Sequence, residues 1–461
     1  MSTTTTTRPE VAPGGGPGGS AGRGTWLERW EPENEAFWAE GGSRRAWRTL
    51  AITTCCLIMA FITWFVVSAL VVRLPQIGFK LTTGQLFWLA AMPGLAGGTL
   101  RLVHMFFTPM FGTRHVVALS TASLLLPLVG WYFAVQDTST PYWMLLLLAF
   151  FAGLGGGNFS SFMPSTSLFF PKRLQGTALA IQAGVGNFGV SVVQFVTPWV
   201  IGFVLVASLG DSQTMTRGGV QSQVWLHNAT MIYVPLVAAF AVWAWIGLKS
   251  VPIVANFGEQ FDIFRSGHTW AMTSLYIVTF GSFSGLSATF PLLIRQVYGD
   301  LPNAPDPLAY AFYGPLVGSI IRVLAGPFCD KYGGARITQY AVIGMAACAV
   351  AVPFATATVS HDTFPWFVAA MLGLFFFAGI GNASTFKQMP MLFAPRQAGG
   401  VIGFTAAIAA YGPFFFGLLF GWAVGAFGRP DAVFHGLAVF FLLNVALNWW
   451  LYARRGAANP C

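Results

Sequence analysis

Charged residues are scarce in this chain. Asp, Glu, Lys and Arg make up 8% of its 461 residues, whereas 55% are hydrophobic. A soluble domain carries about 25% charged residues. This composition and the mean hydropathy of +0.64 therefore exclude an ordinary soluble protein and indicate one embedded in a lipid bilayer. The net charge of +9 does not indicate a nucleic-acid partner, because the cations form no cluster suited to a phosphate backbone.

Groups that carry enzymatic chemistry are also few. The apolar stretches hold no carboxylate pair, no histidine cluster and no Ser, His and Asp arrangement suited to catalysis, so we do not expect an enzyme. The cysteines lack the spacing of a metal site, and we expect no metal and no cofactor. We interpret them as packing residues or, at the end of the chain, as incidental: Cys55, Cys56, Cys329, Cys348 and Cys461.

The N-terminal region lacks the apolar segment of a secretory signal peptide. We predict that residues 1–47 form a cytoplasmic tail. The first ~25 are rich in Thr, Gly and Pro, cannot bury a core and are expected to be disordered. The remainder is amphipathic and suited to the membrane surface.

Twelve apolar stretches follow, each near the roughly 20 residues that a helix needs to cross a bilayer. They predict an all-α membrane protein with twelve transmembrane helices in two pseudo-symmetric six-helix bundles. The bundles comprise residues 48–249 and 268–455, joined by a cytoplasmic linker at 250–267, and residues 207–227 form a polar external loop. The predicted spans are 49–72, 84–111, 115–135, 143–170, 176–206, 228–249, 268–294, 308–329, 335–357, 363–392, 398–427 and 432–453.

Positive charge predicts the orientation. With both termini in the cytoplasm, 16 of the 24 Lys and Arg residues lie inside and five lie outside. Loops rich in Lys and Arg stay in the cytoplasm, so we expect both termini there.

Short sequence motifs of the first half recur in the second half. Residues 157–162 (GNFSSF) recur 224 residues later as 381–386 (GNASTF), and 169–172 (FFPK) matches 393–396 (FAPR) at the same offset. Parallel repeats with a site near the bilayer midplane are typical of one large class of secondary transporters.

Two arginines lie inside predicted spans, Arg101 in the second and Arg322 in the eighth, 221 residues apart and nearly in register with the repeat. A guanidinium in hydrocarbon costs about 3 kcal/mol on insertion scales and usually faces an interior cavity with a partner. No Asp or Glu lies within the predicted spans. We therefore predict that the pair binds a mobile anion. The alternative is a structural role, with each arginine paired to carboxylates or carbonyls.

Glycines gather in the middle of the fifth and eleventh spans. They allow another backbone or a ligand to come close, and tight helix packing is the alternative interpretation. Asn187 belongs to a polar stripe on the fifth span, and its amide needs a partner inside the bundle, so we predict that it faces the substrate. The glycines are Gly184, Gly186, Gly189, Gly403 and Gly412.

Several motifs carry a resemblance to a known family. They are 183–189 (AGVGNFG), 403–407 (GFTAA), 134–142 (AVQDTSTPY), 281–283 (GSF) and 326–336 (GPFCDKYGGAR). With them, residues 28–455 resemble the NarK-type bacterial nitrate/nitrite porters of the major facilitator superfamily. The first-half counterpart of the last motif, 108–114 (TPMFGTR), lacks its Asp. We therefore expect the contact that closes the protein at loop 108–114 to be looser than its second-half counterpart or to be built differently.

The resemblance implies a bacterial inner-membrane protein that handles nitrate and nitrite, and we expect it to work as a monomer. Arg101 and Arg322 would hold the anion with Asn187 beside them, and the glycine runs would be the nitrate signature motifs. Aromatic residues would line the site, by position Phe61, Phe159, Tyr276 and Phe280. Nitrate is planar, and a guanidinium can donate two parallel hydrogen bonds to two of its oxygens.

Two further residues have open roles. His104 lies three residues after Arg101, near the same helix face, and could tune the site or relay a proton; a packing role is the alternative. Lys387 lies in a polar segment of the tenth span. It either adds positive potential to the permeation path, which we favour, or extends toward the cytoplasm.

The predicted function is a nitrate/nitrite antiporter that imports nitrate and exports nitrite by alternating access. A proton symporter needs a titratable carrier in its path, typically an acid, and the spans offer none. Two arginines that repel each other until an anion binds would instead give obligate exchange. The alternatives are a proton-coupled nitrate symporter and an anion channel.

Overall fold

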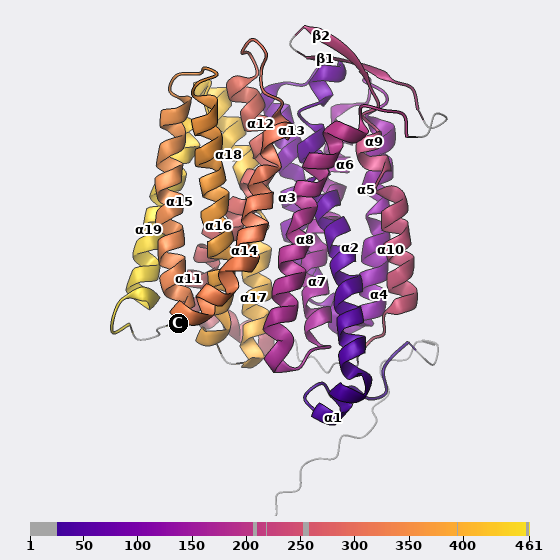
Figure 1. Ribbon diagram of the computed structural model, residues 1–461, viewed down its shortest axis with the longest axis vertical. Coiled ribbons are helices and arrows are strands. Elements are labelled where there is room, and N and C mark those ends of the chain that lie inside the picture. The colour runs from indigo at the N-terminus through magenta and orange to yellow at the C-terminus, as the bar shows by residue number, and fades with distance from the viewer. Residues whose placement is uncertain (1–24, 206–209, 218, 252–257, 394, 458–460) are drawn as a thin grey trace, which may run out of the picture.

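The computed structural model describes residues 25–461 except 206–209, 218, 252–257, 394 and 458–460. Long helices run side by side between two faces (Figure 1). A hairpin of β1 (Gln213–Arg217) and β2 (Val220–Val224) lies on one face, here called the hairpin face. Both ends of the described chain lie on the opposite face, here called the terminus face. The predicted disorder at the N-terminus concerns residues outside the described part, apart from Thr25.

The twelve predicted spans are all present in the described chain, which confirms the all-α membrane fold. The hairpin was not predicted, because the residues that form it were expected to be a polar loop without strands. The spans are Glu35–Leu70, Thr83–His104, Phe107–Ala134, Tyr142–Ser167, Lys172–Val200, Asn228–Gly247, Gly267–Tyr298, Pro307–Tyr332, Gly334–Thr356, Phe364–Leu392, Gly399–Phe427 and Asp431–Ala453.

The described residues of the N-half form ten α-helices and two short helices of other types. They are α1 (Glu35–Phe37), η1 (Trp38–Gly42), α2 (Ser43–Leu70), η2 (Leu74–Ile77), α3 (Thr83–His104), α4 (Phe107–Ser123), α5 (Leu125–Ala134), α6 (Tyr142–Ala152), α7 (Leu154–Ser167), α8 (Lys172–Val200), α9 (Asn228–Met231) and α10 (Val234–Gly247).

The C-half follows η3 (Gly258–Arg265). Its elements are α11 (Gly267–Tyr276), η4 (Ile277–Gly281), α12 (Ser282–Tyr298), α13 (Pro307–Ala311), α14 (Tyr313–Tyr332), α15 (Gly334–Thr356), α16 (Phe364–Leu392), α17 (Pro395–Ala409), α18 (Gly412–Phe427), α19 (Asp431–Asn448) and η5 (Trp449–Ala453).

Local sequence sets several helix boundaries. The Thr82 hydroxyl accepts from the Gln85 N–H, and the Gln85 side chain accepts from the Thr82 N–H. This capping box begins α3. Gly112 interrupts α4 with φ +74° and Gly428 ends α18 with φ +70°, backbone conformations that residues with a Cβ rarely adopt. The second span ends at His104 and the third begins at Phe107, so residues 107–111, predicted at the end of the second span, belong to the third.

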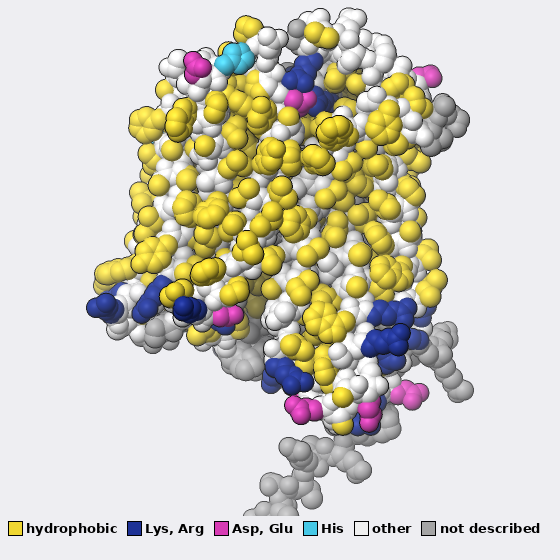
Figure 2. Space-filling view, in the orientation of Figure 1, with side chains coloured by type: hydrophobic (Ala, Val, Ile, Leu, Met, Phe, Trp, Pro, Cys, Tyr) yellow, Lys and Arg dark blue, Asp and Glu magenta, His cyan; other side chains and the backbone are white. Residues whose placement is uncertain are grey.

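Apolar side chains cover the middle of the molecule, and charged ones gather toward the two faces (Figure 2). This is the pattern of a protein surrounded by lipid. The halves meet through α3 against α18 and α8 against α14. A Cβ at Gly417 would lie 2.7 Å from the Ala91 Cβ. The missing side chain therefore lets α18 approach α3 closely.

The segment before α2 is folded onto the N-half at the terminus face. The Leu27 N–H donates to the Ser250 carbonyl at 2.8 Å, and the Trp30 indole donates to the Leu168 carbonyl at 3.0 Å. The Glu33 carboxylate accepts from the Lys172 N–H at 2.9 Å. This contact places a negative charge at the positive end of the α8 dipole. The amphipathic segment is thus bound to protein through its aromatic side.

Candidate functional site

Arg101 lies at the centre of the molecule with no exposed surface. Its Nε donates to the Gly156 carbonyl at 2.8 Å, and its Nη1 donates to the Ala406 carbonyl at 2.9 Å. Gly156 belongs to α7 and Ala406 to α17, so this guanidinium bridges the two halves. Its Nη2 is buried and has no hydrogen-bond partner among the described residues.

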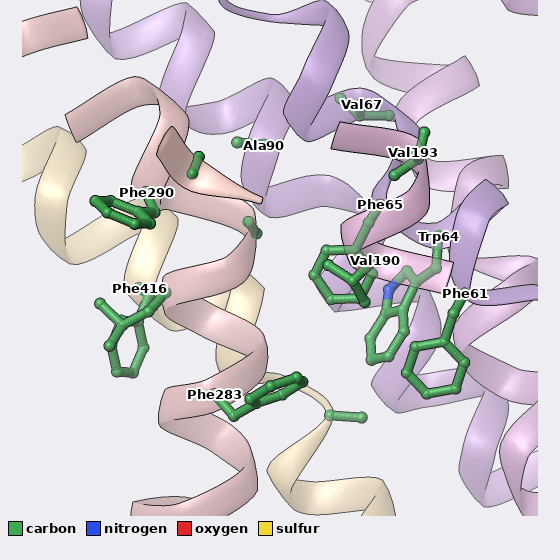
Figure 3. Packing of buried hydrophobic residues seen from close by; sticks show 14 of the residues in the cluster. Phe61, Trp64, Phe65, Val67, Ala90, Val190, Val193, Phe283, Phe290 and Phe416 are labelled. Atoms are coloured by element: carbon green, nitrogen blue, oxygen red, sulfur yellow. The ribbon is translucent and has the colours of Figure 1, made fainter. Parts of the chain in front are cut away.

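Three aromatic rings surround the Arg101 guanidinium. Its Cζ lies 4.6 Å from the ring centre of Phe159 and 5.1 Å from those of Trp64 and Phe280. Trp64 lies beside Phe61 on α2 (Figure 3). Cation–π contacts in a desolvated site are worth roughly 2 kcal/mol. They partly offset the cost of burying this charge without a carboxylate.

Arg322 on α14 is bound differently. It is 7% exposed, and its Cζ lies 5.1 Å from the Phe386 ring centre. No hydrogen bond of ordinary length and angle joins its guanidinium to the described protein, and its Nη1 is buried without a partner. Arg322 thus keeps its donors free, whereas Arg101 has committed two of its own to backbone carbonyls.

A line of aromatic rings connects the two arginines. Phe280, which contacts Arg101, stacks on Tyr276 with 5.4 Å between ring centres and 7° between planes. Tyr276 lies 5.2 Å from Phe386, which in turn contacts Arg322. The Tyr276 hydroxyl is buried and lacks a hydrogen-bond partner in the described chain. The two guanidinium groups therefore flank one aromatic-walled centre.

Asn187 adds two more unsatisfied polar atoms. Its side chain is fully buried on α8, and neither Oδ1 nor Nδ2 has a partner within the described structure. Gly184 lies on the same stripe, where a Cβ would come within 2.5 Å of Val323, the neighbour of Arg322. A buried polar group without a partner costs about 1–3 kcal/mol. A polar ligand at the centre would remove part of this cost.

The centre has free donors suited to a small anion. Its free cationic N–H groups come from both halves of the protein, and its walls are flat rings. No carboxylate neutralises it, since acids in the described spans occur only near their ends: Glu35, Glu40, Asp330 and Asp431. The described residues also form no group of His, Cys, Asp and Glu that could hold a metal ion.

The structure brings most of the predicted site residues together. Phe61 lies one layer back, 6.4 Å from the Phe159 ring centre, and is not among the rings over a guanidinium. Two such rings, Trp64 and Phe386, were missed. Phe386 could have been found as the repeat counterpart of Phe162. The sequence offered one sign that Trp64 lies at the site, namely its position one helical turn after Phe61.

The predicted glycines mark close contacts between helices. A Cβ at Gly189 would come within 2.5 Å of the Ile58 carbonyl, and one at Gly186 would lie 2.7 Å from Leu57. A Cβ at Gly412 would overlap the Gly281 carbonyl, whereas Gly403 has only Met105 nearby, at 3.8 Å. Packing therefore explains Gly186, Gly189 and Gly412 directly.

His104 and Lys387 have structural partners. His104 is 5% exposed, and its Nδ1 lies 3.1 Å from the Ser161 hydroxyl, which fits the packing interpretation. The Lys387 ammonium lies 2.5 Å from the Asp330 carboxylate, and both side chains are well exposed, at 42% and 66%. Lys387 therefore extends to the terminus face, contrary to the alternative that the sequence favoured, because a long side chain can reach water there.

The first-half counterpart of the 326–336 loop is tied to its own half. The Arg114 Nε donates to the Trp245 carbonyl at 2.6 Å, and the Arg114 N–H donates to the Ser250 hydroxyl at 3.2 Å. The contact at this loop is thus built differently from the Lys387–Asp330 pair of the second half. The sequence predicted either a looser contact or a differently built one.

An ion cluster joins the halves at the hairpin face. Asp306, before α13, accepts from Arg73 at 2.7 and 2.8 Å and from Arg217 of β1 at 2.8 Å. Burial alone would raise the pKa of the Asp306 carboxyl. The two guanidinium groups outweigh this effect and hold the pKa below its ordinary value of 3.8.

Other bonds between the halves lie on the same side. Gln194 on α8 donates to the Ser287 carbonyl at 2.8 Å, and the hydroxyls of Thr99 and Tyr411 lie 2.8 Å apart. Bonds between the halves join Arg73, Thr99, Arg101, Gln194 and Arg217 to the C-half. The halves are therefore fastened together on that side.

Comparisons with known proteins give a consistent family. The model of the Major Facilitator Superfamily matches residues 52–386. The chain is 63% identical over 441 residues to the "Probable nitrate/nitrite antiporter NarK2" of Thermus thermophilus, covering 95% of this chain and 99% of that protein. It is 37% identical to the "Nitrate/nitrite transporter NarU" of Escherichia coli (strain K12), covering 93% and 96%.

Solved structures show the same fold at low identity. The D-xylose-proton symporter aligns with a TM-score of 0.64 at 15% identity, covering 87% of this chain and 97% of its own. A bacterial homolog of the human lysosomal transporter Spinster, inward-facing and unoccupied, aligns with a TM-score of 0.59 at 14% identity, covering 88% and 96%. At this identity the likeness concerns the fold alone.

Proposed function

Because this chain belongs to the Major Facilitator Superfamily, we propose that it exchanges nitrate for nitrite across a bacterial inner membrane by alternating access. The anion is held between Arg101 and Arg322, with Asn187 and Tyr276 as neighbours. One observation carries the proposal: two buried guanidinium groups keep free donors in a centre that contains no carboxylate. The names of the two curated relatives support the choice of nitrate and nitrite.

The walls of the centre favour a flat anion. Nitrate is planar and nitrite is bent, so each can lie between aromatic rings while its oxygens accept from a guanidinium edge. Sulfate and phosphate are tetrahedral and thicker, and they carry more charge to desolvate.

Exchange follows from the electrostatics of the empty centre. Without an anion, two positive charges share a region of low dielectric, where repulsion opposes closure of the halves around them. A bound monoanion offsets that repulsion, so the loaded carrier changes sides more readily than the empty one. Import of nitrate is thereby coupled to export of nitrite.

The orientation and the assembly belong to the same proposal. The terminus face is cytoplasmic, in line with its share of Lys and Arg, and the glycine runs of α8 and α17–α18 provide the surfaces on which the helices move. The bonds between the halves, which lie toward the hairpin face, support a state closed to the outside. Residues 48–249 and 268–455 act as the two moving bodies of a functional monomer.

Proteoliposomes test the exchange. Vesicles loaded with nitrite should take up labelled external nitrate rapidly, and empty vesicles should not. The Arg322→Gln variant should lose uptake. Its matched control, Arg44→Gln, removes the same charge from an exposed position and should retain it. Rapid uptake into empty vesicles under an inward proton gradient would instead establish symport, and single-channel currents would establish a channel.

A further inference from the structure

A second cavity opens at the hairpin face, away from the central arginines. Its volume is about 810 Å³. The N-half contributes residues 75–87 and the hairpin to its walls, and the C-half contributes residues 292–307. We call this cavity the vestibule. Figure 2 shows basic and acidic side chains grouped beneath the hairpin on this face.

Positive charge is concentrated around the vestibule. Arg217 and Arg295 line it, and Arg73 lies at its base through hydrogen bonds to Gln76 and Asp306. The acids beside these three cations are Asp300 and Asp306. The loops elsewhere on this face carry two cations and four acids: Lys80, Arg429, Asp137, Asp211, Asp362 and Asp431. The vestibule is therefore locally positive on a face that is otherwise acidic.

The charges at the base do not cancel. Arg73 and Arg217 both bind the single Asp306 carboxylate, with shortest distances of 2.7 and 2.8 Å, which leaves one positive charge in excess. The Arg73 side chain is only 2% exposed, and its Nε has no partner among the described residues. The excess charge is therefore poorly screened by water.

Arg295 adds a guanidinium with free donors. It lies in the last turn of α12 and is partly buried, and no hydrogen bond or ion pair joins its side chain to the described protein. Nearby amides of Gln76, Gln296 and Asn303 also line the vestibule. An anion in this cavity would meet one free guanidinium and several neutral donors.

We propose that the vestibule is a second anion site, which concentrates small inorganic monoanions at the hairpin face before they reach Arg101 and Arg322. The site is wide, so it selects by charge, whereas selection by shape takes place at the aromatic-walled centre. Clefts lined by one sign of charge raise the local concentration of the opposite ion. The assignment of nitrate as the concentrated anion rests on the proposed function.

Arg295→Gln tests the site through the direction of transport. The attraction between unit charges about 4 Å apart in water corresponds to roughly a fivefold change in affinity. In vesicles of defined orientation, the nitrate KM for entry from the hairpin face should rise about fivefold, with kcat unchanged. The KM for entry from the terminus face should stay the same. High salt should abolish the difference in KM between wild type and Arg295→Gln, because the screening length falls to about 3 Å at 1 M salt.

Two controls accompany this variant. Arg295→Lys keeps the charge and should behave as wild type, and Arg44→Gln removes a charge from an exposed position near the terminus face and should leave the hairpin-face KM unchanged. An unchanged KM in Arg295→Gln, or an equal change from both faces, would overturn the proposal.

A second measurement does not depend on transport. A quinolinium dye attached at Gln296→Cys, in a protein whose five native cysteines are replaced, reports iodide by quenching. Arg295→Gln should lower the quenching constant severalfold at low ionic strength. If quenching is unaffected, the vestibule proposal fails. If quenching falls while the wild type shows no nitrate exchange, the vestibule proposal stands and the proposed function fails.

Discussion

The unequal hydrogen bonding of the two arginines predicts that they will not respond alike to substitution. In Arg322→Lys the positive charge remains but the planar fork is lost, and with it one of two parallel hydrogen bonds to the anion. A hydrogen bond to a charged group is worth about 1.5–3 kcal/mol. Nitrate affinity should therefore fall roughly 10- to 100-fold, with little loss of stability, because the Nη1 of Arg322 is buried without a hydrogen-bond partner among the described residues.

Arg101→Lys should lose affinity and stability together. The lysine cannot replace both donors to the Gly156 and Ala406 carbonyls, so at least one buried acceptor would lose its partner, at a cost of about 1–3 kcal/mol. Calorimetry with nitrate gives the affinities, and thermal unfolding of the detergent-solubilised protein gives the stabilities. Near-normal affinity in Arg322→Lys, or equal destabilisation by the two substitutions, would refute this division of roles.

Three further predictions concern other parts of the molecule. Gly412→Ala should cost about 1–3 kcal/mol of stability by overpacking, whereas Gly176→Ala, with no atom within 4 Å of the new Cβ, should be neutral or slightly stabilising; thermal unfolding compares them. Lys387→Gln should leave the nitrate KM unchanged and cost at most about 1 kcal/mol, because its pair with Asp330 is solvent-screened; a large KM change would restore Lys387 to the permeation path. The depressed pKa of Asp306 means that its ion cluster is fully present above pH 3.8 and is lost only as pH falls through a still lower value. Accessibility of the hairpin side to a thiol reagent should therefore be constant from pH 5 to 8 and rise in Asp306→Asn.

The membrane helices could be predicted because lipid imposes a simple rule. A spanning segment must be long, apolar and helical, and each of the twelve carries that pattern in its own residues. The hairpin could not be found in the same way. Its residues 213–224 are mostly polar, and the pairing of Gln213 with Val224 depends on where α8 and α9 place the two ends of the loop.

The central site was predictable in composition and less so in arrangement. An arginine within hydrocarbon indicates an interior site by its cost alone, which is why Arg101 and Arg322 could be singled out. The repeat, however, suggests that the two are equivalent. Their difference arises from the Gly156 and Ala406 carbonyls, and a backbone acceptor leaves no mark in a sequence. Trp64 was missed for a similar reason, since one aromatic residue among many on α2 has no distinguishing signal.

Because the bonds between the halves lie on one side, the balance between the two closed states should depend on temperature. In the proposed alternating access, opening the hairpin side breaks an ion cluster and several polar bonds, so closure of the terminus side must be made from other contacts. Ion pairs and apolar packing change in strength differently as temperature rises. The populations of the two closed states will therefore shift with temperature, and so will the ratio of the apparent affinities measured from the two sides of the membrane.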